Sequence, residues 1–549
     1  MGNPPYERTK YIIEEQPFYE EHYETCYGAY DICILFVEIS NNLINKLGKF
    51  GFITSNKYLV ADYGIKLREF LQKDSFVEQL VDLTECPSSF EKALISPLIT
   101  ITRKQPVERV KIAILKKNNL SLLNKLQVVT SNSENENFTV EFRNSQDLQD
   151  KFSGHLNIYL YGKKEILAKK IYSTSKLLSD VAQIRTGIMG FEYWKMDDII
   201  QDSKSLSCNQ VKILPPSLIN RYSNLWGIEL VDLYKKKYGY PVITFDRTKI
   251  DDNTWKLFKS EKIVVRGVAR CVSATFDEEG QGILVATHAI ISNRYSDYHV
   301  LALLNSRLFD WLHIVKFYSA RIPQGSLRYP VSFYKQLPIR RICFTTPKKE
   351  REKLSEEGKK VYEKCLENGD WDSLLFFVGQ RLKKQYIPDP ELVKKHNADP
   401  LNKDFQIREG ELIERSDVVH DLLAFLAEKM IEYNKEKNKE TKSFLGWLER
   451  EVGTKVQNLT GKTTIRKYHE TTADNLMSIF RKNKKKLQID PSRRDFQDRL
   501  STEFDTSIQK LTPLKRKIEM TDHLIDQIVY KLYGLTEAEI KIVEESFAK

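Results

Sequence analysis

The chain has 549 residues, of which 41% are hydrophobic and 29% are charged, a composition typical of a globular protein with two to four domains. It contains no run of about 18 apolar residues, and no basic region followed by an apolar stretch opens it, so neither a membrane span nor a signal peptide is predicted. Seven cysteines without C-x-x-C spacing indicate reduced thiols, a cytoplasmic location and no metal site.

The first feature along the chain is the tetrapeptide Asn3-Pro4-Pro5-Tyr6. Two consecutive prolines stiffen the loop, because each fixes φ near −65° and restricts the residue before it. A stiff loop can hold a side-chain carbonyl and a backbone carbonyl where they accept both hydrogens of a planar amine, and the aromatic residue offers a face on which a base can stack. The alternative is an ordinary surface turn.

Residues 1–104 alternate between helix and strand patterns. Apolar spacing predicts helices over 30–47 and 59–71, and short apolar runs predict strands over 50–54, 77–83 and 94–102. This order is typical of half of an open α/β sheet that closes with an antiparallel pair. We therefore expect a partial doubly wound sheet in this part of the chain.

The rest of the chain divides into three further regions. The polar run SNSENEN at 131–137 predicts an exposed connector over 105–176. Short β-like runs, including 329–339, predict an α+β domain over 177–345, with a hairpin turn at 278–282. Charged helical patterns predict a mainly helical region over 346–549.

The net charge of +11 is unevenly distributed. Residues 1–104 carry eleven Lys and Arg against fifteen Asp and Glu, whereas residues 301–350 carry nine against two. Within 301–350 the arginines are interleaved with aromatic residues, a combination that favours a nucleic-acid partner over a solvated basic face.

Several segments of the chain resemble one family of enzymes. The N-terminal segments resemble the adenine-N6 DNA methyltransferases of restriction-modification systems, in the branch with a TaqI-like specificity domain. These segments are the tetrapeptide, then YDICILFVE, GKFGFITSNKYL, YGIKLREFL and SSFEKALISPLITITRK. The segments LLSDVAQIRTGIMG, KIVVRGVARCVSATFD, LALLNSRLFDWL and QGSLRYPVSFYKQLPI resemble the target-recognition region of that branch, and TDHLIDQIVYKLYGLTEAEIKIVE resembles its C-terminal helix. The tetrapeptide itself also occurs in enzymes that methylate glutamine or guanine amines.

The resemblance implies roles for the N-terminal residues. Asn3 and the Pro4 carbonyl would accept hydrogen bonds from the adenine N6 amine, within the stiff loop that Pro5 completes, and Tyr6 would stack on a base flipped out of the duplex. The methyl donor would be S-adenosylmethionine.

Two further assignments come from the same resemblance. Phe90 would contact the base from its edge, although an ordinary core aromatic is the alternative. Tyr30 and Asp31 match the family segment that lines the cofactor pocket.

In the specificity region, the resemblance and the basic charge together imply contacts with double-stranded DNA. The candidates are Arg266, Arg270, Arg321 and Arg328, because arginine can engage guanine with two hydrogen bonds or bind phosphate. Surface ion pairs are the alternative for each of them.

The sequence also departs from the family. The glycine-rich turn and the acidic residue that bind the cofactor in the family precede the tetrapeptide, and here only two residues do; the G-x-G at 280–282 lies in the predicted hairpin. We expect the chain to lack the N-terminal cofactor-binding half. Three explanations remain open: a separate polypeptide that carries this half, a truncated reading of a larger protein, or an enzyme that has lost catalysis and kept DNA recognition.

Two functions are therefore compatible with the sequence. The first is adenine-specific DNA methylation, favoured by the complete tetrapeptide. The second is a sequence-specific DNA-binding subunit without chemistry of its own, favoured by the absence of the glycine-rich turn.

Overall fold

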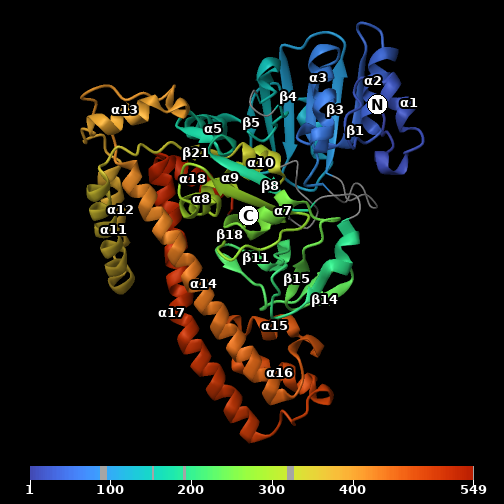
Figure 1. The fold of residues 1–549 in the computed structure, drawn as a ribbon. Coiled ribbons are helices and arrows are strands. Elements are labelled where there is room, and N and C mark those ends of the chain that lie inside the picture. Colours follow the sequence, from blue (N-terminus) through green and yellow to red (C-terminus); the bar gives the residue numbers. More distant parts are fainter. Residues whose placement is uncertain (87–95, 151–153, 189–192, 318–326, 548–549) are drawn as a thin grey trace. The chain divides into compact units, whose positions relative to one another are not determined.

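The computed structural model describes residues 1–86, 96–150, 154–188, 193–317 and 327–547 (Figure 1). The chain forms two compact units. Unit 1 consists of residues 1–170, 268–271 and 311–329, and unit 2 consists of residues 171–267, 272–310 and 330–549.

Unit 1 is an α/β domain built on a six-stranded mixed sheet with the order β1-β3-β2-β4-β6-β5. Strands β1, β2 and β4 run parallel to one another, and β3 and β6 are antiparallel to their neighbours. Its elements are α1 (Gln16–His22), α2 (Cys33–Leu43), β1 (Lys49–Ser55), α3 (Ile65–Lys73), β2 (Phe76–Asp82), β3 (Pro97–Arg103), β4 (Arg109–Leu115), α4 (Leu122–Gln127), β5 (Ser133–Glu134), β6 (Phe138–Asn144), α5 (Gly162–Ser173, which continues into unit 2), β17 (Val268–Ala269) and β20 (Leu327–Arg328).

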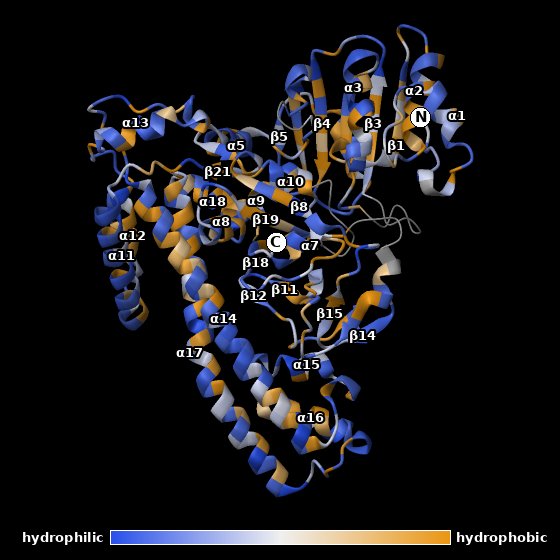
Figure 2. Ribbon diagram, in the orientation of Figure 1, coloured by the Kyte–Doolittle hydropathy of each residue, from blue (hydrophilic) through white to orange (hydrophobic). Residues whose placement is uncertain are grey.

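Helices cover both faces of this sheet. Along β4, Val110 and Ile112 point into the core that α2 and α3 contribute to, whereas Ala113 and Leu115 point into a second core with α4. Such a switch between faces follows from the two-residue period of a strand. Figure 2 shows β4 largely in the hydrophobic colour, as expected for a strand buried on both faces. The predicted α/β class is confirmed.

The boundary of the sheet differs from the sequence-based expectation. Residues 105–176 were expected to be a connector, but they supply β4, β5 and β6 of the same sheet, and unit 1 continues to Lys170. The polar run at 131–137 contains β5 and the exposed turn that joins β5 to β6. One exposed turn does not end a domain when the strands on both sides of it have apolar residues to bury.

Unit 2 begins with short strands and helices. A four-stranded sheet has the order β18-β16-β19-β8, and a three-stranded sheet has the order β10-β15-β9. The elements are β7 (Ser175–Leu177), α6 (Leu178–Val181), β8 (Ala182–Thr186), β9 (Ile200–Asp202), β10 (Gln210–Lys212), β11 (Ile219–Asn220), β12 (Ser223–Asn224), β13 (Val231–Leu233), β14 (Lys236–Tyr238), β15 (Pro241–Thr244), α7 (Asp252–Lys259), β16 (Lys262–Arg266), β18 (Ala274–Asp277), β19 (Thr287–Ser292), α8 (Asp297–Leu304), α9 (Arg307–Phe317, which continues into unit 1), α10 (Val331–Lys335) and β21 (Pro338–Arg340).

Two local predictions in this region are wrong. The turn at 278–282 exists, because the Asp277 carboxylate accepts hydrogen bonds from the N–H groups of residues 279–281, but β18 and β19 are not a hairpin, since β16 lies between them. The β-like run at 329–339 contains the helix α10, whose buried side chains are the adjacent Phe333 and Tyr334. Adjacent buried residues fit one face of a helix and not one face of a strand.

The last two hundred residues are helical, as predicted. The helices are α11 (Lys348–Asn368), α12 (Trp371–Arg381), α13 (Pro390–Ala398), α14 (Ser416–Val452), α15 (Lys462–Arg466), α16 (Ala473–Lys482), α17 (Arg494–Leu532) and α18 (Glu537–Glu545). Helices α14 and α17 lie side by side, and residues 453–495 fold between their ends (Figure 1). Near the end of α17, the side chains of Ile525, Ile528, Val529 and Leu532 are buried on one face.

Candidate functional site

The tetrapeptide begins at the carboxyl end of β1. Gly2 pairs in parallel with Phe52: its N–H donates to the Gly51 carbonyl at 2.9 Å, and its own carbonyl accepts from the N–H of Ile53 at 3.1 Å. A Cβ at position 2 would lie 2.6 Å from Cε1 of Phe52, so only glycine fits there without displacing the ring. The carboxyl ends of parallel strands are where open α/β sheets bind ligands.

The Tyr6 hydroxyl connects the tetrapeptide to the strand. It lies 2.8 Å from Oδ1 of Asn3 and 2.7 Å from the carbonyl oxygen of Ile53. Burial, followed by the nearby Cys33 and Asp31, raises the pKa of Tyr6 to about 12, so the hydroxyl keeps its proton and acts as a donor. Because Oδ1 has two lone pairs, the exposed Asn3 retains acceptor capacity for a further donor.

The segment that follows the tetrapeptide pairs with the segment before α2. The N–H of Thr9 donates to the Tyr30 carbonyl at 3.1 Å, and the N–H of Ile32 donates to the Glu7 carbonyl at 2.9 Å. This pairing brings Asp31 near Tyr6, and Oδ1 of Asp31 accepts the N–H of Cys33 at 3.1 Å. The Tyr30 side chain is fully buried in the core.

Lys57, which follows β1, interacts electrostatically with two further cations. Burial lowers the pKa of Lys57, and the positive charges of Arg8 and Arg328 lower it further, while Asp31 opposes them. Arg8 and Arg328 are exposed and Lys57 is half-buried. Among the described residues, none of the three cations forms an ion pair. The sequence prediction missed Arg8 and Lys57, although each is within three residues of the tetrapeptide or the end of β1.

A buried polar network also lies at the carboxyl edge of the sheet. The Asp82 carboxylate accepts hydrogen bonds from the hydroxyls of Thr84 and Tyr159, each at 2.7 Å. The Asn56 amide donates to Oγ1 of Thr84 at 3.1 Å and lies 3.5 Å from Oδ1 of Asp82. Burial raises the pKa of Asp82 to about 6, although these hydrogen bonds partly oppose the shift. Nothing in the sequence analysis singled out this network.

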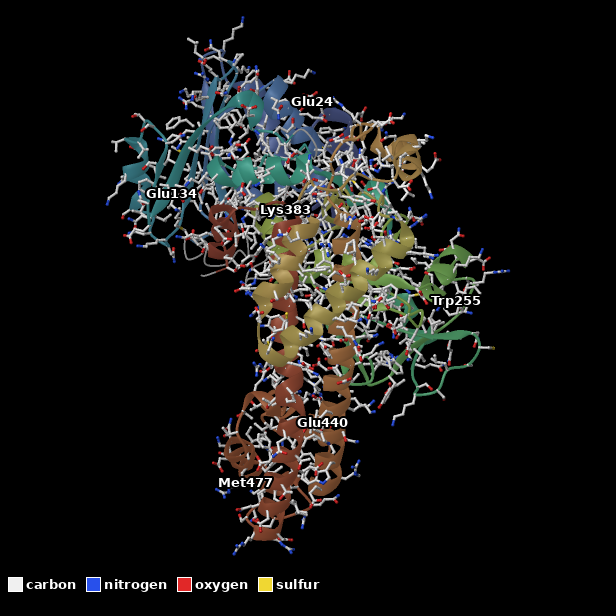
Figure 3. All side chains as sticks on the ribbon, turned by 90° about the vertical axis from the view of Figure 1, so that its left-hand side faces the viewer. Glu24, Glu134, Trp255, Lys383, Glu440 and Met477 are labelled. Carbon is white, nitrogen blue, oxygen red and sulfur yellow. The ribbon has the colours of Figure 1, made fainter. Side chains whose placement is uncertain are left out.

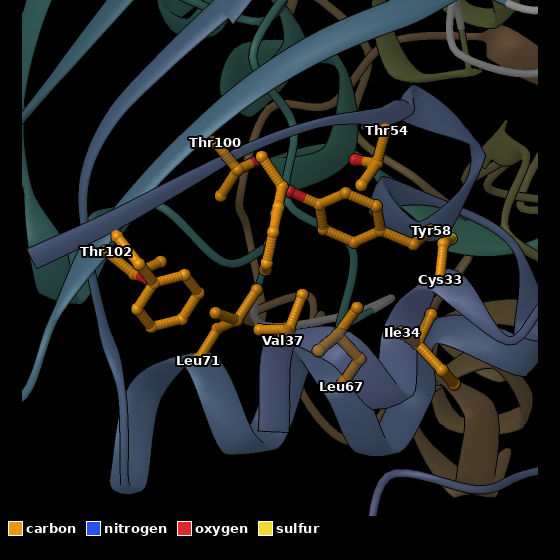
Figure 4. Close-up of a pocket in the computed structure, with 11 residues that line it drawn as sticks. Cys33, Ile34, Val37, Thr54, Tyr58, Leu67, Leu71, Thr100 and Thr102 are labelled. Atoms are coloured by element: carbon orange, nitrogen blue, oxygen red, sulfur yellow. The ribbon is translucent and has the colours of Figure 1, made fainter. Parts of the chain in front are cut away.

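A cofactor of nucleoside size does not fit the cavity that unit 1 has beneath its sheet. Figure 4 shows this cavity between α2, α3 and the strands, with Tyr58 donating to or accepting from Thr100 at 2.7 Å. Its lining is mostly apolar, and its volume of about 10 Å³ holds at most one water molecule. Neither Tyr30 nor Asp31 lines it. This cavity is therefore not the cofactor site that the resemblance assigned to Tyr30 and Asp31.

The predicted DNA-binding arginines fall into different places. Strands β17 and β20 pair, with Val268 opposite Arg328. The exposed Arg328 therefore lies on a two-stranded ribbon of unit 1, and the exposed Arg270 directly follows its strand β17. Arg266 belongs to unit 2, is half-buried, and its guanidinium lies 3.4 Å from the Ile219 carbonyl. Arg321 lies outside the described residues, as does Phe90.

Part of the basic charge of 301–350 is neutralised within the protein. Arg340 pairs with Glu414 at 2.8 Å, and Arg341 pairs with Asp404 at 2.6 Å. These two arginines are therefore engaged within the protein. The described residues contain no group of three or more His, Cys, Asp or Glu side chains placed to hold a metal ion, and none of their helices is long and apolar enough to cross a membrane.

Comparison with known families finds matches in three separate segments. Residues 1–89 match the Eco57I restriction-modification methylase, residues 218–339 match the TaqI-like C-terminal specificity domain, and residues 417–529 match a domain of unknown function, DUF8810. The first range includes the tetrapeptide, and the second includes all four candidate arginines.

Curated relatives match the chain over short stretches. The Type II restriction enzyme and methyltransferase RM.Eco57I of Escherichia coli is 31% identical over 85 residues, which are 15% of this chain and 8% of the relative. The Type II methyltransferases M.BstVI of Geobacillus stearothermophilus and M.PaeR7I of Pseudomonas aeruginosa are 32% identical over 111 residues and 30% identical over 109 residues, respectively. The aligned parts cover 20% and 19% of this chain, and 20% and 18% of those relatives.

Among solved structures, the Type IIL restriction-modification enzyme MmeI in complex with DNA aligns with a TM-score of 0.40 at 11% identity, over 78% of this chain and 57% of that one. The family models and the curated relatives together confirm the resemblance to a restriction-modification methyltransferase with a TaqI-like specificity domain.

Proposed function

We propose that this chain methylates the N6 amine of adenine in DNA within a restriction-modification system, as the amine-binding and target-recognition part of the enzyme. The observation that carries the proposal is the Asn3-Pro4-Pro5-Tyr6 loop at the carboxyl end of β1, with Tyr6 holding Oδ1 of Asn3. The resemblance to Type II methyltransferases supports the general reaction, and the choice of adenine rests on the resemblance of the tetrapeptide together with that of the specificity segments that follow it.

In this proposal the loop holds the amine of a base that has left the duplex. Oδ1 of Asn3 and the Pro4 carbonyl accept its two hydrogens, which favours lone-pair density on the nitrogen, and the half-buried Tyr6 ring stacks on the base. S-adenosylmethionine supplies the methyl group when bound. The chain's own contribution is positioning and polarisation of the amine, for which no covalent intermediate is needed.

DNA would reach this loop along exposed cations of unit 1. Arg328 lies on the β17–β20 ribbon and Arg270 directly follows β17, and the charges of Arg328 and Arg8 act on Lys57 beside the tetrapeptide. Exposed cations that form no ion pair within the described part of the chain suit phosphate contacts, which position a duplex without reading its sequence. Arg266, Arg321 and the edge contact from Phe90 remain proposals from the family resemblance.

We further propose that the cofactor is held by elements outside this chain, such as a separate polypeptide that carries the remaining half of the catalytic domain. The fully buried side chain of Tyr30, which offers no surface to a cofactor, supports this. On its outer side β1 pairs with Gly2 and with no further strand of the described chain, so another strand can extend the sheet there. Both proteins would act in the cytoplasm.

The alternative is a DNA-binding subunit without catalytic activity, which the same buried tyrosine favours. Transfer of a radiolabelled methyl group to unmethylated DNA separates the two. We expect little transfer by the purified chain and clear transfer once the products of neighbouring genes are added. DNA binding without transfer under both conditions would favour the alternative.

A further inference from the structure

The segment between α14 and α17, residues 453–495, carries concentrated positive charge. It contains eleven Lys and Arg against four Asp and Glu, a net charge of +7, whereas residues 416–452 of α14 have a net charge of −2 and residues 496–532 of α17 have none. We call residues 453–495 the tip. The charge therefore belongs to the tip and not to the helix pair that carries it.

The tip is a folded unit and not a loose loop. The rings of Tyr468 and Phe444 stack with centroids 3.9 Å apart, and the Tyr468 hydroxyl lies 2.6 Å from Oγ of Ser507. Figure 3 marks Met477, buried in the tip core, and Glu440 on α14. The core side chains of the tip are Val456, Leu459, Ile465, Tyr468, Leu476, Met477 and Phe480.

One buried amide organises the basic run of the tip. Asn483, 2% exposed, donates to the Thr460 carbonyl and accepts the Thr460 N–H, both at 2.9 Å. These bonds fasten the end of α16 and the lysines that follow it to the segment before α15. The cations on either side of Asn483 therefore project from a fixed backbone.

The cations of this run are exposed. Lys482, Lys485 and Lys486 follow or flank Asn483, and Arg481 occupies the last turn of α16. Among the described residues, Arg481, Lys482 and Lys485 form no ion pair, whereas Lys484 pairs with Asp490 at 2.8 Å. Phosphate groups can therefore reach several closely spaced charges without first breaking protein ion pairs.

The helix pair is held against the part of unit 2 that matches the specificity domain. Lys435 pairs with Glu278 at 2.7 Å, and Nδ2 of Asn438 donates to Ser223 at 2.9 Å. Arg221 pairs with Asp522 of α17 at 2.7 Å. From Asn438 to the end of α14 is 14 residues, about 21 Å at the helical rise of 1.5 Å. The tip therefore begins about 21 Å along α14 from this anchorage. A DNA duplex of about six base pairs, at 3.4 Å each, has the same length.

We propose that the tip binds the sugar–phosphate backbone of double-stranded DNA beside the recognition sequence, without reading bases. The proposal rests on the proposed function in taking DNA as the partner. Lysines dominate the run, and lysine acts on phosphate as a point charge rather than as a base-reading fork. The tip lies within residues 417–529, which match a domain of unknown function. DNA-backbone binding would therefore be a function of that domain in this chain.

The test is DNA binding by the full chain as a function of salt. The variant combines Arg481→Gln, Lys482→Gln and Lys485→Gln. The control combines Lys349→Gln, Lys353→Gln and Lys360→Gln, which replace three exposed lysines of α11. Across α11 as a whole, positive and negative charges nearly cancel. Each binds a fluorescent 40-base-pair duplex between 50 and 200 mM KCl, and thermal melts verify that all proteins are folded.

Each phosphate contact contributes about 0.9 to the slope of log K against log salt. We expect the magnitude of this slope to fall by about two to three in the tip variant, and its affinity for DNA at 50 mM KCl to fall at least tenfold. The affinity of the control variant should stay within twofold of that of the wild type. An unchanged slope and affinity in the tip variant would overturn the proposal, and would indicate that the tip meets another acidic partner, while leaving the proposed function intact. If the wild type itself showed no salt-dependent binding, both would fail.

Discussion

The tetrapeptide loop and the tip are both polar, but they are built differently. In the loop, individual atoms have fixed neighbours: the Tyr6 hydroxyl lies within 2.8 Å of both Asn3 and Ile53. In the tip, the cations are exposed and the fixed element is the backbone beneath them, held by Asn483. Chemistry on one amine depends on single atoms, whereas binding to a repeating phosphate chain depends on the number of charges. Substitutions should therefore act atom by atom in the loop and charge by charge in the tip.

The largest expected effect is at Asn3. Asn3→Ala removes the side-chain acceptor for the amine, and loss of one preorganised polar contact to the reacting group typically lowers the rate 10²- to 10³-fold. We expect that loss in methyl transfer by the assembled enzyme at saturating DNA, with the Kd for DNA unchanged within twofold. Transfer at the wild-type rate would refute the role of Asn3. Lys482→Gln in the tip should do the reverse, weakening binding without lowering the saturated rate.

Asp82 provides the next test, through pH. Its pKa is raised to about 6 from its ordinary value of 3.8, so the folded state holds the proton more tightly than the unfolded state. Stability should fall as pH rises from about 4 to about 6, by up to about 3 kcal/mol. Asp82→Asn should remove this dependence, since the hydroxyls of Thr84 and Tyr159 can turn to accept from the new amide.

Urea unfolding of the wild type and Asp82→Asn between pH 4 and 7.5 measures the difference. The matched control is Asp490→Asn in the tip, where the exposed carboxylate has a pKa lowered by its hydrogen bond with Lys484. We expect Asp82→Asn to be more stable than the wild type at neutral pH, and we expect no such gain in stability for Asp490→Asn. Parallel pH profiles for the wild type and Asp82→Asn would show that Asp82 is already ionised in the fold.

Two substitutions of Tyr6 distinguish the role of its ring from that of its hydroxyl. Tyr6→Ala loses base stacking, about 1–3 kcal/mol, and also the hydrogen bonds to Asn3 and Ile53. Tyr6→Phe keeps the ring and loses a hydrogen bond, about 0.5–1.5 kcal/mol. Fluorescence of 2-aminopurine at the target position of a duplex reports base extrusion, and we expect a larger loss for alanine. Equal losses would mean that the hydroxyl, not the ring, holds the site.

The smallest expected effect is Lys484→Gln. The ion pair with Asp490 is exposed on both sides, and such pairs contribute little to stability. We expect an unchanged melting temperature and a fall in the salt slope smaller than the ~0.9 of one phosphate contact, because Lys484 already pairs with Asp490. A clear drop in melting temperature would show that this part of the tip depends on individual contacts, as the loop does.

The sequence predicted the elements whose signals are local. The strand at 50–54 and the helices of the C-terminal region follow from the spacing of apolar residues, and the tetrapeptide was recognisable from its own four residues. The boundary at 104 and the hairpin at 278–282 were wrong, because each depends on which strand pairs with which. Pairing joins residues far apart in the chain, as β4 beside β2 and β16 between β18 and β19 show.

What the sequence by itself determined is the chemistry available: an amine-binding loop, arginines among aromatics, and a resemblance to restriction-modification methyltransferases. Only the tertiary structure decided how that chemistry is used. It placed Arg328 near Lys57 beside the loop and Tyr30 in the core, and it paired Arg340 with Glu414. The reason is physical: the residue type sets the charge and hydrogen-bonding groups of a side chain, but its burial and partners depend on contacts across the fold.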